Sequence, residues 1–98
     1  MKLHTFHPEA AEEYAGAARY YGAIDPGLGG RFFDEIERLI LEVRQHPDRF
    51  WLFDPPVRRH LSTVFPYAVF FLDQPDHVWI VAVMHCKRRP SYWRQRLE

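Results

Sequence analysis

The segment VWIVAVM, residues Val78 to Met84, is the longest apolar run in the sequence. It has the length of a β-strand and is far too short to cross a bilayer. Successive side chains of a strand point to opposite faces, so a strand that is apolar throughout is covered on both faces. The segment therefore predicts an interior strand of a sheet that is packed on each side.

Two further strands are predicted before this one. The sequence DQPD, residues Asp73 to Asp76, is typical of a turn. The apolar segment Tyr67–Leu72 is therefore expected to form an antiparallel hairpin with Val78–His85. Val57–Val64 predicts a third strand, whereas Phe50 to Pro56, which ends in two prolines, is expected to be irregular.

The first half of the chain predicts one strand and two helices. Lys2–Phe6 alternates polar and apolar residues, which is typical of a strand with one buried face. Pro8–Tyr21 repeats apolar residues at helical spacing and is followed by the turn Asp25–Gly27. A second helix is predicted to begin between Pro26 and Arg31 and to end near His46, because a proline follows.

These elements predict a single α+β domain over residues 1–98, with two N-terminal helices packed on a small, mainly antiparallel sheet. The expected order is β-α-α-β-β-β, with a short C-terminal helix from about Ser91. No signal-peptide pattern opens the sequence and the lone Cys86 cannot form an internal disulfide, so we expect a cytoplasmic protein. The histidines lack metal-ligand spacing, so no metal is expected. We also expect no cofactor and no membrane partner.

The formal net charge is zero, but the charge is unevenly distributed. Residues 1–49 carry six Lys or Arg against nine Asp or Glu, and residues 50–98 carry seven against four. Affinity for duplex nucleic acid grows with the number of phosphates neutralised, so this balance argues against extensive duplex binding. A local basic patch can still hold a few phosphates or acidic side chains.

The strongest local charge follows the apolar strand. Between positions 87 and 96 there are five cations and no acid: Lys87, Arg88, Arg89, Arg94 and Arg96. We refer to residues 87–98 as the C-terminal tail. A segment of this composition is expected to recognise, or act on, an anionic partner.

Several short motifs give the chain a resemblance to a known family. The order of elements is accompanied by a helix that ends at a proline and by the following residues: Arg58-Arg59-His60-Leu61, Phe65-Pro66-Tyr67, and His85 followed by Arg88, Arg89, Pro90, Tyr92, Trp93 and Arg96. Over its whole length the chain resembles the RelE/ParE superfamily of type II toxin-antitoxin toxins and is closer to the ParE-like branch.

The resemblance implies a bacterial toxin that inhibits growth and is neutralised by a cognate antitoxin in a hetero-oligomer. A ParE-like member acts on DNA gyrase, with a role in plasmid stabilization. The alternative is a RelE-like endoribonuclease that cuts messenger RNA at the ribosome. A second alternative is a non-toxic module that only binds its antitoxin.

A metal-independent nuclease needs a base, an acid and cations near the phosphate. The catalytic candidates for that alternative are Arg58, His85, Arg89 and Tyr92, because imidazole titrates near neutral pH and a tyrosine can stack or move a proton. Arg58 and Arg59 point to opposite faces of a strand, and the family pattern favours Arg58 as the partner of the tail. His85 and Tyr92 have structural explanations too, since a histidine at a strand end or an aromatic residue over a sheet often only completes the packing.

Two binding surfaces are predicted. The candidates for contact with the target or with phosphate are Arg58, Lys87, Arg88, Arg89 and Arg96. The aromatic residues Phe50, Trp51 and Phe53 are candidates for binding the antitoxin, although they can equally seal the edge of the core.

Overall fold

The computed structural model describes residues 1–89 and 91–98. The described elements are β1 (Leu3–Phe6), α1 (Pro8–Ile24), α2 (Pro26–Gln45), η1 (Pro47–Arg49), β2 (Trp51–Asp54), β3 (Val57–Leu61), β4 (Tyr67–Asp73), β5 (His77–His85) and η2 (Arg94–Leu97). The predicted α+β class and the order of the main elements are confirmed.

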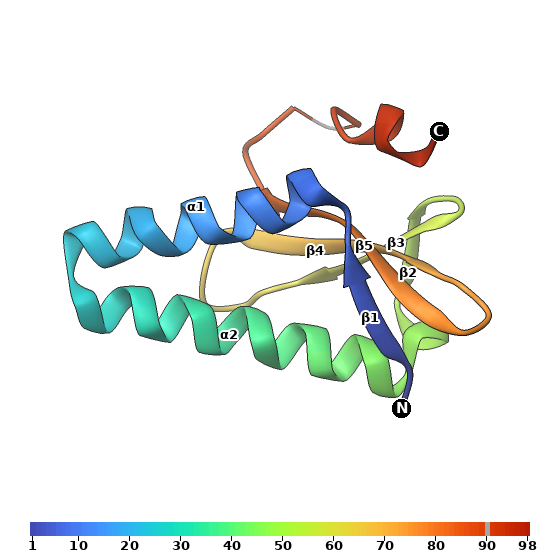
Figure 1. Cartoon of the computed structure of the whole chain (residues 1–98), viewed down its shortest axis with the longest axis horizontal. Coiled ribbons are helices and arrows are strands. Elements are labelled where there is room, and N and C mark those ends of the chain that lie inside the picture. Colours follow the sequence, from blue (N-terminus) through green and yellow to red (C-terminus); the bar gives the residue numbers. More distant parts are fainter. Residues whose placement is uncertain (90) are drawn as a thin grey trace.

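The strands form one five-stranded sheet in the order β1-β5-β4-β3-β2. β1 pairs with β5 in parallel, and the other neighbours are antiparallel. Figure 1 shows α1 and α2 side by side, running in opposite directions along the sheet. The predicted interior position of the apolar strand is confirmed, since β5 lies between β1 and β4.

Several boundaries differ from the sequence-based prediction, and α1 continues to Ile24 instead of ending at Tyr21. The segment that was expected to be irregular contains the edge strand β2, and β3 ends at Leu61 instead of Val64. The C-terminal helix is one 3-10 turn that begins at Arg94. β2 was missed because its four residues carry no alternation of buried and exposed positions, and its pairing with β3 is the interaction that defines it.

Local capping explains the sharp turn between the helices. The backbone N–H of Asp25 donates to the Tyr21 carbonyl and closes α1, while the Asp25 carboxylate accepts from the Leu28 N–H and opens α2. Pro26 occupies the first turn of α2, where its missing N–H has no partner to lose. One residue therefore ends one helix and starts the next.

The sheet is covered on both faces. On one face, side chains of α1 and α2, including Phe32, Ile36 and Leu39, pack against β4 and β5. On the other face, Trp93 of the C-terminal tail is fully buried against Phe70 and neighbouring side chains of β4 and β5. The tail is thus a structural layer of the domain, and Figure 1 shows it in red, returning past the start of α1.

Candidate functional site

The C-terminal tail docks where the outer edge of β5 loses its strand partner. β1 pairs with β5 only as far as Ile80, because α1 begins shortly after Phe6. Beyond that point the Val83 N–H donates to Glu13 Oε1 at 3.1 Å, and Arg96 Nη1 donates to the Val81 carbonyl at 2.9 Å. Two side chains therefore supply the hydrogen bonds that a neighbouring strand would have made.

Glu13 of α1 connects this edge to the tail. Its Oε1 accepts from Arg96 Nη1 at 3.0 Å, and its Oε2 accepts from Arg96 Nη2 at 2.8 Å. Oε2 also accepts from the Tyr92 hydroxyl at 2.5 Å and from Arg88 Nη1 at 3.3 Å. The side chains of Glu13 and Arg96 are only 13% and 5% exposed, so the desolvation of both charges is offset by this set of hydrogen bonds.

The geometry changes the expected chemistry of Tyr92. Burial, followed by the hydrogen bond to Glu13, raises the pKa of the Tyr92 hydroxyl well above its usual range. Arg88 stacks on the Tyr92 ring at 3.7 Å and Arg96 lies 5.0 Å from it. A phenol in this environment stays protonated and donates its O–H to the Glu13 carboxylate, so it is poorly placed to transfer that proton to a substrate.

In the described part of the chain, three of the five cations of the tail are paired with an acidic side chain and two are not. Arg88 and Arg96 bind Glu13, and Arg96 Nε also lies 3.3 Å from a carboxylate oxygen of Glu9. Arg94 pairs with Asp54 of β2. Lys87 and Arg89 are exposed, and neither side chain has an acidic partner within residues 1–89 and 91–98.

His85 ends β5 in a half-buried position. Its Nδ1 accepts from the Lys87 N–H at 3.0 Å, which leaves the proton of the neutral ring on Nε2. The ring also meets Tyr67 edge-on at 5.2 Å. These contacts fit the structural explanation of this residue, because they stabilise the turn that leads into the tail.

The prediction that Arg58 joins the tail is wrong. Arg58 of β3 lies opposite Phe71 of β4, whose side chain faces the helices, so Arg58 is on the helix side of the sheet. There its guanidinium donates to the Phe50 carbonyl at 2.7 Å. His85 pairs with Tyr67 at the other end of β4, so about 13 Å of strand separates the two positions. The nuclease candidates Arg58, His85, Arg89 and Tyr92 are therefore not brought together as one site.

Arg59 lies on the face that Arg58 was expected to occupy. It pairs with Phe70, which packs against Trp93, and its guanidinium lies 4.8 Å from the Trp51 ring and 4.7 Å from the Phe53 ring. Strand alternation predicts that the two arginines face apart, but only the register with β4 decides which of them faces the tail.

The three aromatic residues that were predicted to bind the antitoxin are divided between two faces. The Phe50 ring packs at a tilt against His60, with 4.4 Å between the ring centroids, and contacts the helix-side core. Trp51 is 61% exposed, and Phe53 packs beside it on the outer face, against Phe70. Phe50 therefore seals the core, and only Trp51 and Phe53 remain accessible from the outer face.

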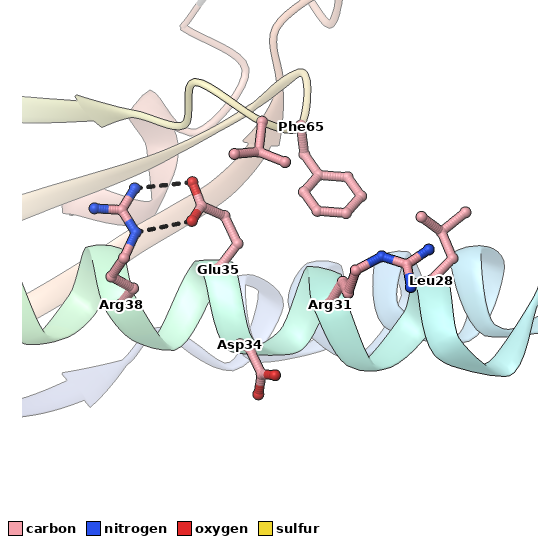
Figure 2. Close-up of a pocket in the computed structure, with 7 residues that line it drawn as sticks. Leu28, Arg31, Asp34, Glu35, Arg38 and Phe65 are labelled. Carbon is pink, nitrogen blue, oxygen red and sulfur yellow. Dashed lines mark hydrogen bonds and ion pairs between the residues drawn. The ribbon is translucent and has the colours of Figure 1, made fainter.

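A separate cavity of about 380 Å³ lies between α2 and the loop after β3. Figure 2 shows Arg38 and Glu35 paired there, beside Phe65. Ser62 also donates to Glu35 at 2.6 Å. The Glu35 carboxylate in this cavity is thus already bound by an arginine and a serine. None of the predicted site residues lines the cavity.

Sequence reasoning missed Glu13, although a signal was present. Ala10, Glu13 and Ala17 share helical i, i+3, i+7 spacing, and both alanines are buried. An acid on the buried face of a helix requires a partner, which is the observation that would have singled it out. Pro90, which contributes to the family resemblance, lies outside the described residues.

Residues 1–89 and 91–98 contain neither a metal cluster nor a membrane-spanning helix. No group of three or more His, Cys, Asp or Glu side chains in these ranges is arranged to hold a metal ion. No described helix combines the length and the apolar character that a membrane span requires.

Comparison with known proteins identifies the family. A family model described as the ParE toxin of type II toxin-antitoxin system, parDE, matches residues 5–90. A solved structure described as the chromosomal ParDE TA system from P. aeruginosa has a TM-score of 0.75 at 15% identity, covering 87% of this chain and 96% of that chain. That likeness shows a shared fold, and no curated protein sequence matches significantly. Because the family model spans most of the sequence, the chain belongs to the ParE toxins of type II toxin-antitoxin systems.

Proposed function

We propose that this toxin inhibits growth by acting on DNA gyrase and that a cognate antitoxin neutralises it. The observation that carries the proposal is the arrangement of Tyr92, whose hydroxyl is bound to Glu13 and whose pKa is raised by burial. With Arg58 also far from His85, the four nuclease candidates do not form an acid and a base beside the cations in the described part of the chain. A poison of gyrase needs a binding surface and no chemistry of its own, so it suits this arrangement better than RNA cleavage.

The proposed target surface is the start of the tail, residues 87–89. Lys87 and Arg89 are exposed there, and Arg88 is half-exposed beside them. Gyrase works on DNA, whose phosphates attract such cations at short range. The surface is small, in keeping with a chain whose formal net charge is zero.

The proposed antitoxin surface is the outer face of β2 and β3. Trp51 and Leu61 are 61% and 43% exposed, and Arg59 lies beside them over the rings of Trp51 and Phe53. Exposed tryptophan and arginine are the residues that most often dominate protein interfaces. Arg59 has no carboxylate partner in the described part of the chain, so an acidic, amphipathic segment of the antitoxin fits this face.

The target is tested with purified, antitoxin-free chain in two reactions. In the first, DNA gyrase supercoils a relaxed plasmid, and we expect inhibition with accumulation of cleaved DNA. In the second, messenger RNA 5′ ends are mapped in a bacterial translation reaction, and we expect no new ends. Ribosome-dependent cleavage without any effect on gyrase would reverse the assignment in favour of the endoribonuclease.

The antitoxin surface is tested by co-expression with the product of an adjacent open reading frame. Trp51→Ala is expected to weaken co-purification. Leu3→Ala is a matched control, because Leu3 is 70% exposed on the edge strand at the opposite side of the sheet. Equal loss in the two variants, or none in either, would place the antitoxin elsewhere.

A further inference from the structure

Glu13 receives more hydrogen bonds than any other side chain in the described part of the chain. Its donors come from two parts of the fold: the Val83 N–H of β5, and Arg88, Tyr92 and Arg96 of the tail. α1 contributes the carboxylate, so this contact joins the first helix to the last residues. No other acid in the described part of the chain binds more than one cation of the tail.

The contact decides which cations of the tail are available. Arg88 is drawn toward α1 by Glu13 and lies on the Tyr92 ring, and the side chain of Arg96 is only 5% exposed because of its contacts with Glu13 and the Val81 carbonyl. Arg96 must lose these partners before it can contact a phosphate, whereas Arg88, whose side chain is 52% exposed, is only restricted in its position by Glu13.

The same contact orients the remaining cations. The Arg88 N–H donates to the His85 carbonyl at 2.9 Å and the Lys87 N–H donates to His85 Nδ1, which closes a tight turn. With Arg88 held on the side of α1, its sequence neighbours Lys87 and Arg89 stay in solvent.

We propose that Glu13 is a positioning residue that anchors the tail and presents Lys87 and Arg89 as the two cations that contact phosphate groups of the target's nucleic acid. The identity of the target rests on the proposed function. The anchoring of the tail by Glu13 does not depend on it. Gyrase-bound DNA and ribosome-bound messenger RNA both present phosphate groups. The gyrase reaction and the translation reaction described above show which of these two nucleic acids is the target.

The first comparison uses three alanine variants that each remove one positive charge. Lys87→Ala and Arg89→Ala are expected to weaken inhibition roughly tenfold each, the ordinary loss for one charged contact. Arg94→Ala is the matched control, because Arg94 is 60% exposed and already paired with Asp54. Its potency is expected to stay within about twofold of wild type. Equal potency of Arg89→Ala and Arg94→Ala would overturn the assignment of Lys87 and Arg89.

The second comparison separates positioning from simple charge. Glu13→Gln adds one net positive charge and leaves Lys87 and Arg89 unchanged. If the tail acts only through its total charge, this variant inhibits at least as well as wild type. If Glu13 positions the tail, inhibition falls and the amides of Val83 and residues 93–97 exchange faster by NMR. Wild-type potency together with faster exchange refutes positioning, and unchanged exchange refutes anchoring.

Two outcomes need separate treatment. If Glu13→Gln does not fold, the pair Arg89→Ala and Arg94→Ala still decides the assignment, because both arginines are exposed. If the wild-type chain inhibits neither gyrase nor translation, the proposed function fails. The variants are then compared on a heparin column, a polyanion that binds the available cations. Earlier elution of Lys87→Ala and Arg89→Ala than of Arg94→Ala supports the inference, and any other order overturns it.

Discussion

The contact between α1 and α2 provides a sharp test of the packing. Gly29 of α2 lies so close to α1 that a Cβ atom there would be 2.7 Å from Gly22 Cα and 3.2 Å from the Ala18 carbonyl oxygen. A Cβ atom on the next residue, Gly30, would meet no side chain and no other element within 4 Å. Alanine substitutions at these two adjacent helical positions therefore differ only in whether the added methyl group meets another backbone.

The magnitudes follow from this difference. Gly→Ala inside a helix stabilises by about 0.5 to 1 kcal/mol when space allows, so Gly30→Ala is expected to raise the free energy of unfolding by that amount. At Gly29 the helices must separate by roughly 1 Å to reach ordinary contact, and overpacking of this kind costs about 1 to 3 kcal/mol. The helix-propensity gain is common to both variants, so their difference isolates the cost of the clash.

Urea unfolding followed by far-UV circular dichroism measures both variants against wild type. Gly30→Ala is expected to be more stable than Gly29→Ala by about 1 to 3 kcal/mol, or roughly 5 to 20 °C in Tm for a domain of this size. Gly22→Ala, whose added Cβ would also meet nothing within 4 Å, is a second control in α1. If Gly29→Ala is as stable as Gly30→Ala, the two helices do not approach as described.

Three further predictions concern the core, the pH dependence of stability and the aromatic residues near β2. Trp93→Ala should lower the free energy of unfolding by about 3 to 5 kcal/mol, because the side chain is fully buried, whereas Trp93→Phe should cost less; urea unfolding compares them. Hydrogen bonds from Arg38 lower the pKa of Glu35 from its ordinary value of 4.5, so stability that is present above pH 4.5 is lost as the pH falls through the lower, folded-state value. Glu35→Gln should flatten this loss in Tm measured between about pH 3 and 7, and an unchanged profile would contradict it. Phe50→Ala should destabilise by about 2 kcal/mol and Trp51→Ala by about 1 kcal/mol or less, because only Phe50 packs into the core; equal losses would contradict the division between faces.

The elements that could be predicted from the sequence are those with a local signal. Helical spacing, Pro8 and the apolar run of β5 each specify structure within a few residues, and the structure agrees with them. The predicted break at Asp25–Gly27 is confined to Asp25, because Pro26 and Gly27 already belong to α2. β2 has no such signal, since it is a short edge strand whose only described pairing, with β3, contains a register shift between Leu52 and Asp54. Its existence depends on β3 lying beside it.

The candidate site shows the same limit at the level of single side chains. Alternation predicts that Arg58 and Arg59 point to opposite faces, but the face that each occupies follows from pairing with Phe71 and Phe70 on β4. Glu13 carried a local signal, its position on the buried face of α1, but its partners lie 70 or more residues away in sequence. Such partners are set by tertiary packing alone.

The charge of the tail illustrates why this matters for function. Counted along the sequence, the tail is a run of five cations, which predicts strong and undirected attraction to any polyanion. In the folded domain, Glu13 of α1 binds Arg88 and Arg96 and holds the tail against the sheet. Charge that fastens a segment to its own domain is not available to a partner until that segment is released. The recognition capacity of the tail is therefore set by Glu13 as much as by the tail's own cations, and substitution of this acid changes what the tail presents although Glu13 is not part of it.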